Sequence, residues 1–280
     1  MIKIFISDLD GTLIHKAKNH VKPNQKNKKA LTELKNNGIK LAAATGRLEK
    51  SIQEVEKNLA LPLYKISVNG AVISDTENKT IHENFLLAET AQKIIKELEE
   101  KYAKDIYFFV LVTDKANNYF RPVVFISKLV NLLYKKRFNT KYLKKEAVKY
   151  ILSDEKVLKI NIGTGKEKKY RLLRELKEEF QESEIFITGS RSVEIGPKNN
   201  SKGTAVLKLL GHLGIKPEEA AYIGDSYNDL PAFKVCKYSF AMSHSEEAVK
   251  EKAVYVVKDV AEAVNKVMKI NKMIKIEGNV

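Results

Sequence analysis

The chain has 280 residues, of which 44% are hydrophobic and 30% are charged, a composition typical of a globular protein with one large or two ordinary domains. No apolar run approaches the roughly 18 residues that a membrane helix requires, so we expect no membrane association. The single cysteine, Cys236, excludes an internal disulfide, and the residues before Asp8 leave no room for a signal peptide. We therefore expect a cytoplasmic protein.

The formal net charge of +15 is compatible with a nucleic-acid surface or with an anionic small substrate. Lysine is spread through most of the helical segments and is usually interleaved with glutamate, as on a solvated helix face. No recognisable DNA- or RNA-binding motif accompanies it. We therefore expect no nucleic-acid partner.

The first part of the chain alternates short apolar strands with amphipathic helices, which is typical of a parallel α/β sheet. Residues 2–7 form a nearly continuous apolar run, as expected for a strand that is buried on both faces. The other elements expected before residue 83 are a helix over 23–37, a strand over 39–44, a helix over 48–59, a strand over 64–68 and a hairpin over 71–81.

After His82 the pattern changes to helices paired with strands that suit an antiparallel sheet. The elements expected here are a helix over 87–102, a strand over 105–113, a helix over 126–138, a strand over 157–163, a helix over 166–181 and a strand over 185–188. Residues 121–150 are strongly basic, with nine Lys or Arg and one acidic residue, Glu146. This basic segment suits either a solvated outer face or a surface that attracts anionic substrates through Lys135, Lys136 and Arg137.

From residue 201 the α/β alternation resumes, with helices over 201–213, 228–235, 245–252 and 260–270 and strands over 220–223, 238–241 and 254–257. The chain shows no internal repeat and no low-complexity tract. We therefore predict an α/β fold in which a Rossmann-like parallel-sheet core, formed by residues 1–82 and 188–280, carries an inserted α+β domain over residues 83–187.

Two carboxylates follow the first strand, at the edge where open α/β sheets bind ligands. Asp8 and Asp10 lie two residues apart on an extended backbone and so point the same way, and Gly11 lets the chain turn sharply afterwards. Two like charges in one cleft require a cation or a shared proton. The pair suits one carboxylate as nucleophile and metal ligand and the other as proton donor and acceptor, and a solvated Asp-Gly turn is the alternative.

Further polar residues are expected at the same edge of the sheet. Thr45, Gly46 and Arg47 follow the second strand and provide a hydroxyl, an unhindered amide and a guanidinium, which suit phosphate oxygens, although a Thr-Gly turn also caps helices. Lys202 begins a helix, where its charge opposes the helix dipole. Its position therefore indicates an anion nearby, unless it is an ordinary surface lysine.

An oxygen-rich turn follows the strand over 220–223. Asp225, Asn228 and Asp229 provide two carboxylates and a carboxamide, which suit Mg²⁺, although acidic residues at a helix start are also common. The separate patterns agree on one chemistry, a phosphoryl-transfer site with a nucleophile, an acid/base, a metal and donors around the phosphate.

These residues, in this order, resemble the four motifs of the haloacid dehalogenase superfamily. The motifs are Asp8-Leu9-Asp10-Gly11-Thr12-Leu13, Thr45-Gly46-Arg47, Lys202 and Gly224-Asp225-Ser226-Tyr227-Asn228-Asp229. Too few residues separate Asp8 from Thr45 for a cap domain, whereas the segment from Thr45 to Lys202 is long enough for one. The insertion therefore resembles the second-position α+β cap of the Cof-type phosphatase branch, which includes sugar-phosphate phosphatases.

The resemblance implies a phosphatase that hydrolyses a small phosphorylated metabolite through an aspartyl-phosphate on Asp8, with Asp10 as general acid and then general base. It assigns phosphate or substrate binding to Thr45, Gly46, Arg47, Lys202 and Asn228. It implies Mg²⁺ as cofactor, at a metal site formed by the Asp8 carboxylate, the Asp10 carbonyl oxygen and Asp225, with Asp229 and Asn228 in support.

One departure from this branch is His244, which stands in the segment Ala241–Ser245 where the branch often has asparagine. Two other functions remain open. A phosphomutase or phosphotransferase would use the same core motifs with a second hydroxyl as phosphate acceptor, and a non-catalytic sensor would bind a phosphorylated ligand without turning it over. The intact set of Asp8, Asp10, Lys202 and Asp225 argues against the sensor. The sequence indicates neither the substrate nor the oligomeric state.

Overall fold

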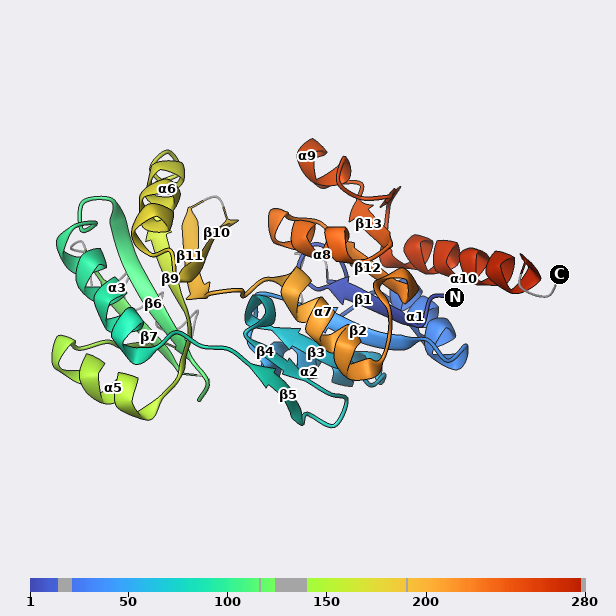
Figure 1. The fold of residues 1–280 in the computed structure, drawn as a ribbon, viewed down its shortest axis with the longest axis horizontal. Helices are drawn as coiled ribbons and strands as arrows, with labels where there is room; N and C mark the ends of the chain where they lie inside the picture. The colour runs from blue at the N-terminus through green and yellow to red at the C-terminus, as the bar shows by residue number, and fades with distance from the viewer. Residues whose placement is uncertain (15–21, 116, 124–139, 190, 278–280) are drawn as a thin grey trace. The chain divides into compact units, whose positions relative to one another are not determined.

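The computed structural model describes residues 1–14, 22–115, 117–123, 140–189 and 191–277. They form two compact units, which we call the core unit, Met1–Glu83 with Ser201–Val280, and the inserted unit, Asn84–Asn200 (Figure 1). The chain leaves the core unit once and returns to it once, so the second unit is an insertion in the first.

The core unit contains an eight-stranded sheet in the order β14-β13-β12-β1-β2-β3-β4-β5. The strands are parallel from β14 to β3, and β4 and β5 add an antiparallel hairpin. Their bounds are β1 Ile4–Asp8, β2 Lys40–Ala44, β3 Tyr64–Ser67, β4 Val72–Ser74, β5 Thr80–Glu83, β12 Ala220–Gly224, β13 Tyr238–Met242 and β14 Tyr255–Val257. The predicted α/β fold with a parallel-sheet core is confirmed.

Helices cover both faces of this sheet and bury its central strand, β1, on both sides. Phe5 packs on one face against α1, α2 and α10, while Ile4 and Ile6 pack on the other against α7 and α8. The helix bounds are α1 Gln25–Asn36, α2 Glu49–Leu59, α7 Lys202–Leu213, α8 Leu230–Val235, α9 Glu247–Lys250 and α10 Val260–Glu277. Helix α10 runs past the predicted end at residue 270, since no glycine or proline interrupts it before Gly278.

The inserted unit contains a six-stranded sheet in the order β10-β11-β9-β6-β7-β8, antiparallel except for β7 with β8. Its strands are β6 Ile106–Thr113, β7 Asn118–Pro122, β8 Thr140–Tyr142, β9 Val157–Thr164, β10 Ser183–Gly189 and β11 Ser192–Pro197. Its helices are α3 Ala88–Glu100, α5 Val148–Asp154 and α6 Lys169–Glu179. Apolar side chains of α3 and α6, such as Leu98 and Leu176, share a core with Phe109 and Ile160 of the sheet, so this unit has its own hydrophobic core.

The inserted unit ends later than the expected boundary at residue 187. Strand β11 pairs antiparallel with both β10 and β9, and the unit therefore continues to Asn200. Within β11, Val193 and Ile195 are buried in the core of this unit, while Glu194 forms an ion pair with Lys159 of β9 at 2.7 Å. This strand was not expected from the sequence, and its pairing partners show that it belongs to the sheet of the inserted unit.

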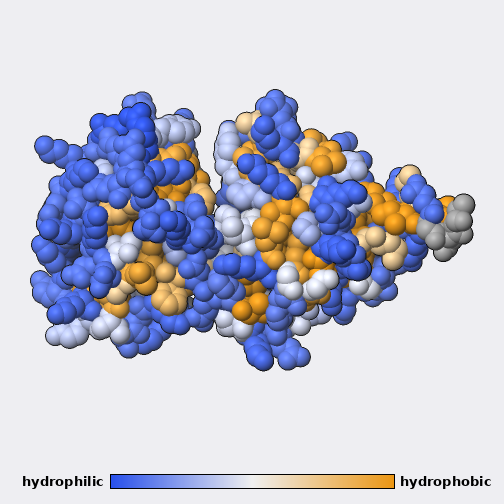
Figure 2. Space-filling model, in the orientation of Figure 1, coloured by the Kyte–Doolittle hydropathy of each residue, from blue (hydrophilic) through white to orange (hydrophobic). Residues whose placement is uncertain are grey.

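Hydrophilic side chains predominate on the face shown in Figure 2, as the charged fraction of the sequence predicts. Among the residues with described positions, no helix has both the length and the hydrophobicity needed to cross a bilayer. The helix predicted over 126–138, with Lys135, Lys136 and Arg137, lies outside the described residues.

Candidate active site

The carboxyl ends of β1, β2 and β12 meet in the middle of the core sheet. Asp8 of β1 pairs with Ala44 of β2, and Ser7 pairs with Ile223 of β12. The residues that follow β2 and β12, Thr45 and Asp225, therefore come next to the end of β1. The strand order runs from β1 to β2 and β3 on one side and from β12 to β13 and β14 on the other, so this edge is the topological switch point at which open α/β sheets bind ligands.

Lys202 lies between two carboxylates in the interior of the core unit. Its Nζ is 2.6 Å from Asp8 Oδ1 and 2.6 Å from Asp229 Oδ1, and the three side chains are at most 6% exposed. Helix α7 places Lys202 there, because Ser201 forms a capping box with Thr204 and fixes the first turn. The sequence predicted an anion near Lys202, and in the structure this negative charge comes from the carboxylates of Asp8 and Asp229.

The charges around Asp8 are unbalanced. Burial raises the pKa of the Asp8 carboxyl well above its usual value; the Lys202 ammonium opposes this shift, whereas Asp229 and Asp225 add to it. Burial by itself lowers the pKa of Lys202, but Asp229 and Asp8 more than offset this and raise it, so the ammonium stays charged. A single lysine therefore faces three carboxylates, an excess of negative charge that suits a divalent cation.

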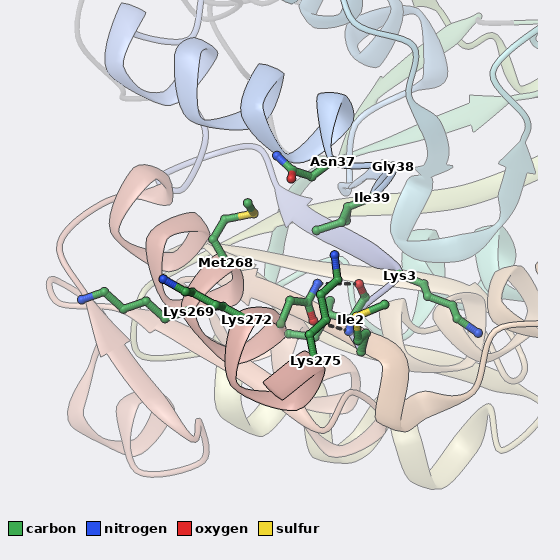
Figure 3. A pocket seen from close by; sticks show the side chains of 11 residues that line it. Ile2, Lys3, Asn37, Gly38, Ile39, Met268, Lys269, Lys272 and Lys275 are labelled. Atoms are coloured by element: carbon green, nitrogen blue, oxygen red, sulfur yellow. Dashed lines mark hydrogen bonds between the residues drawn. The ribbon is translucent and has the colours of Figure 1, made fainter. Parts of the chain in front are cut away.

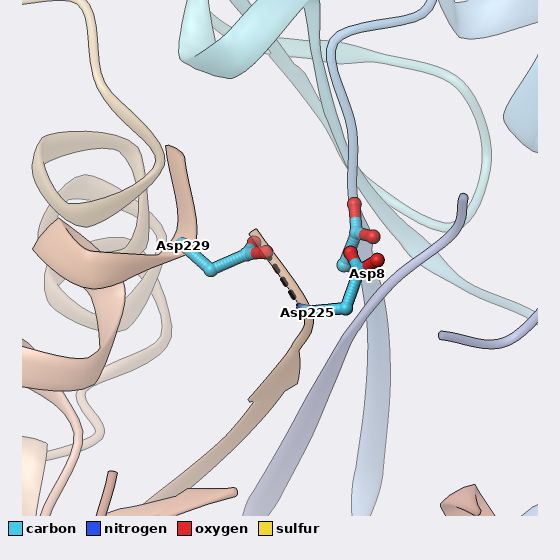
Figure 4. A group of neighbouring side chains, drawn as sticks. All are labelled: Asp8, Asp225 and Asp229. Atoms are coloured by element: carbon cyan, nitrogen blue, oxygen red, sulfur yellow. Dashed lines mark hydrogen bonds between the residues drawn. The ribbon is translucent and has the colours of Figure 1, made fainter. Parts of the chain in front are cut away.

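The fourth motif brings Asp225 against the first. Carboxylate oxygens of Asp8, Asp225 and Asp229 all lie within 4.8 Å of one another (Figure 4). Gly11 has φ +85°, and a Cβ there would come within 2.2 Å of Asp225 Oδ2. Glycine at this position therefore allows both the sharp turn after Asp10 and the close approach of the Asp225 carboxylate.

Asp229 is occupied by protein donors. Its Oδ1 accepts hydrogen bonds from Lys202 Nζ and from the Tyr222 hydroxyl, each at 2.6 Å, and its Oδ2 accepts from the amides of Asp225 and Ser226, each at 3.0 Å. Figure 4 shows the bond from the Asp225 amide. With two donors on each oxygen, Asp229 orders the turn that carries Asp225, and it also belongs to the acidic group that could hold a metal.

Tyr222 is a site residue that the sequence analysis missed. It is fully buried in β12, and its hydroxyl reaches Asp229 from within the strand. The available signal was a single tyrosine among alanine and isoleucine in a buried strand, because a buried phenol requires a hydrogen-bond partner.

Asp10 is paired with Arg47. Arg47 Nε donates to Asp10 Oδ2 at 2.7 Å, and Nη2 donates to Asp10 Oδ1, so the pair is bidentate. Both side chains are partly exposed. Arg47, which the sequence assigned to phosphate binding, thus pairs in this structure with Asp10, which the sequence assigned as general acid.

Asn69 connects the second motif to the fourth. The backbone N–H of Asn69 donates to the Thr45 backbone carbonyl at 2.9 Å, and the Asn69 side-chain oxygen accepts from Asn228 Nδ2 at 3.1 Å. A Cβ on Gly46 would come within 3.3 Å of the Asn69 carboxamide, so glycine allows this contact. Asn228 is therefore held by Asn69, which follows β3 at the same edge of the sheet.

His244, the residue that departs from the family pattern, also lies at this edge. Its Nε2 is 3.6 Å from Asp225 Oδ2, and its side chain is half exposed. The loop after β13 thus contributes an imidazole beside the acidic cluster.

The fold and the site together define an α/β protein that gathers carboxylates and a buried lysine at the carboxyl edge of a parallel sheet. The chain belongs to the haloacid dehalogenase-like hydrolase family, whose family model matches residues 5–268. The resemblance inferred from the motifs is thus confirmed.

Relatives agree with this assignment over nearly the whole chain. A 5-amino-6-(5-phospho-D-ribitylamino)uracil phosphatase of Bacillus subtilis strain 168 is 27% identical over 279 residues, covering 92% of this chain and 93% of that protein. The crystal structure of SMU.1108c from Streptococcus mutans UA159 has a TM-score of 0.81 at 22% identity, covering 96% and 100% of the two chains. A subclass IIB sugar phosphatase of the superfamily has a TM-score of 0.76 at 20% identity, covering 96% and 99%. The phosphatase class expected from the sequence is confirmed.

Proposed function

We propose that this enzyme is a Mg²⁺-dependent phosphatase that hydrolyses a small phosphorylated metabolite through an aspartyl-phosphate on Asp8. The observation that carries the proposal is the buried Asp8 carboxylate, held by Lys202 at 2.6 Å and placed beside Asp225. The names of the relatives, a phosphorylated-ribityl phosphatase and a sugar phosphatase, support a small phosphomonoester as substrate. The inserted unit is proposed as the cap that selects it.

Asp8 is assigned the nucleophilic step. Lys202 fixes Oδ1, and Oδ2 attacks the phosphorus while the bond to the ester oxygen breaks. Asp10 gives its proton to the leaving oxygen. In the second step, a water that loses its proton to Asp10 attacks the phosphorus, the bond to Asp8 breaks, and inorganic phosphate leaves with both carboxyl groups restored.

The ion pair between Asp10 and Arg47 must open, and Asp10 must take up a proton from water, before the first proton transfer, because Arg47 contacts both oxygens of the ionised Asp10. We infer that the substrate phosphate takes the guanidinium from Asp10, since phosphate is also a bidentate partner for arginine. The Thr45 hydroxyl and the Gly46 amide are the other donors proposed for the phosphate.

The residues present fit Mg²⁺, which prefers oxygen ligands and balances excess negative charge. The carboxylates of Asp8 and Asp225 and the carbonyl oxygen of Asp10 would hold it, with Asp229 ordering the turn that carries Asp225. When bound, the ion neutralises charge that develops on the transferred phosphoryl group.

The test is a screen of the purified full chain for phosphate release from a panel of phosphomonoesters, with Mg²⁺ or with EDTA. The panel includes sugar phosphates, 5-amino-6-(5-phospho-D-ribitylamino)uracil and nucleoside monophosphates. We expect release in Mg²⁺ from at least one small phosphoester and none in EDTA. A mock preparation from cells that carry an empty vector, purified in the same way, controls for contaminating phosphatases.

The same screen separates the other functions. A rearranged phosphosugar in place of free phosphate would identify a phosphomutase, and transfer to an added alcohol would identify a phosphotransferase. Saturable binding of a phosphoester without turnover would identify a sensor. Undiminished release in EDTA would refute the Mg²⁺ dependence.

Replacement of Tyr222 by phenylalanine is expected to raise the Mg²⁺ concentration for half-maximal activity by about tenfold, because Asp229 then orders the Asp225 turn less well. The ring packing against Phe233 is retained. Initial rates measured against Mg²⁺ concentration test this. The matched control is Tyr227→Phe in the same turn, whose half-exposed side chain bonds Glu246, and an equal effect of both changes would contradict the role of Tyr222.

A further inference from the structure

A pocket of about 460 Å³ lies at the amino edge of the core sheet (Figure 3). It is lined by the residues that precede β1, by the turn between α1 and β2, and by the C-terminal half of α10. Strand β1 begins beside the pocket and ends at Asp8, and its five residues in extended conformation span about 16 Å. Its volume is within the range of about 300–1,000 Å³ that is usual for small-ligand sites.

The inner lining of this pocket is aliphatic. Ile2 and Ile39 are buried parts of the hydrophobic core, and Met268 of α10 packs against the same core beside the pocket. Figure 3 shows the Met268 side chain reaching from α10 toward Gly38 and Ile39. No aromatic side chain is among the lining residues described, so the surface suits a flexible hydrocarbon chain better than a planar ring.

The rim of the pocket is basic. Lys269, Lys272 and Lys275 lie three residues apart along α10, and Lys3 comes from the other wall. Lys3 pairs with Glu219 at 2.6 Å, whereas no carboxylate in the described ranges lies within ion-pair distance of the three lysines of α10. The helix dipole favours Lys275 in the last turn, but Lys269 lies well before it. Three like charges along one wall favour an anionic occupant.

The walls are held together before any ligand binds. The Ile2 amide donates to Asn271 Oδ1 at 2.6 Å, and Asn271 Nδ2 donates to the Ile2 carbonyl at 3.0 Å, which fixes α10 to the start of β1. A preformed site avoids the entropic cost of ordering its walls on binding.

We propose that this pocket binds an aliphatic anion, with the hydrocarbon chain on Ile2, Ile39 and Met268 and the acidic head among Lys269, Lys272 and Lys275. This site is distinct from the active site in place and in chemistry, because it recognises a hydrocarbon chain and needs no phosphate. The expected ligand is a free small molecule of the fatty carboxylate class.

The test is calorimetric titration of the full chain with decanoate below its micelle concentration, a probe that cannot be a phosphatase substrate. We expect one saturable site per chain, and at least about tenfold weaker binding of inorganic phosphate, which lacks the chain, and of decyl maltoside, which lacks the charge. The double variant Lys272→Glu, Lys275→Glu should weaken decanoate binding at least about tenfold. The matched control Lys29→Glu, Lys57→Glu makes the same charge change on exposed lysines of α1 and α2, and should stay within about twofold of the unmodified protein.

The Asp8→Asn variant should bind decanoate as the unmodified protein does, which keeps this result independent of the proposed catalytic function. Equal loss of binding in the two double variants would overturn the proposal, because it would indicate a general charge effect. Binding to vesicles that contain anionic lipid, without any binding to decanoate, would also overturn the proposal, because the ligand would then be a bilayer surface.

Discussion

Replacement of Asp8 by asparagine is expected to lower phosphate release at least about a thousandfold, because a carboxamide cannot form the acyl phosphate. Asparagine has the same shape and retains an oxygen for Lys202, so the loss would come from the chemistry and not from the packing. The measurement is the initial rate with the best substrate of the panel at saturating Mg²⁺.

The thermal stability of this variant is the control for folding. Burial raises the pKa of Asp8 in the folded state, so above that pKa the ionised carboxylate opposes folding, and a neutral amide removes this cost. Lys202 keeps Asp229 as its partner. Without Mg²⁺ we therefore expect the midpoint of thermal unfolding to stay the same or to rise.

A second variant, Asp8→Glu, keeps the charge but moves the carboxylate by one methylene, and it should also lose at least about a hundredfold in rate. More than a few per cent of the normal rate in Asp8→Asn, after contaminants are excluded, would rule out Asp8 as the nucleophile. A large fall in the unfolding midpoint of Asp8→Asn would show that the buried Asp8 carboxylate does not oppose folding.

Replacement of Asp225 by alanine is expected to lower kcat/KM at least about a hundredfold and to raise the Mg²⁺ requirement. The reason is that the Asp225 carboxylate lies beside Asp8 in the acidic group that suits a divalent cation, and this cation would offset the charge that develops on the phosphoryl group. Initial rates over a range of Mg²⁺ concentrations measure both effects.

A readout independent of activity is the thermal shift on adding Mg²⁺. The unmodified protein should be stabilised by the ion, since a ligand that binds only the folded state raises the midpoint, and Asp225→Ala should lose this shift. Glu246→Ala is the matched control, because it removes a nearby carboxylate whose bond to Tyr227 is exposed. An unchanged Mg²⁺ curve in Asp225→Ala would show that the metal is bound elsewhere.

Local patterns in the sequence were enough to predict where the site would form. Asp8, Thr45 and Asp225 each lie at or just after the end of a strand, and the ends of neighbouring parallel strands meet at one edge. The position of Lys202 against the helix dipole indicated an anion, and the structure places Asp8 and Asp229 there. Which partner each of these side chains binds depends on the tertiary contacts.

Hydrogen-bond partners of the site residues come from distant parts of the chain. Asp229 is filled by donors from Lys202, Tyr222 and its own turn, and Arg47 contacts Asp10, because the shortest available charge-assisted bonds form once the loops are side by side. A polar side chain in a sequence does not show which of several partners will lie within about 3 Å of it.

The sequence by itself therefore determined the parallel-sheet core, the insertion and the motifs at the carboxyl edge, since periodicity and turn chemistry act within a few residues. Only the tertiary structure decided that β11 joins the sheet of the inserted unit, that Asn69 links Thr45 to Asn228, and that α10 and the start of β1 enclose a pocket. Alternation within a strand shows which of its faces is buried. The neighbour of that strand, and the side chains that meet across a cavity, depend on contacts between segments far apart in the chain.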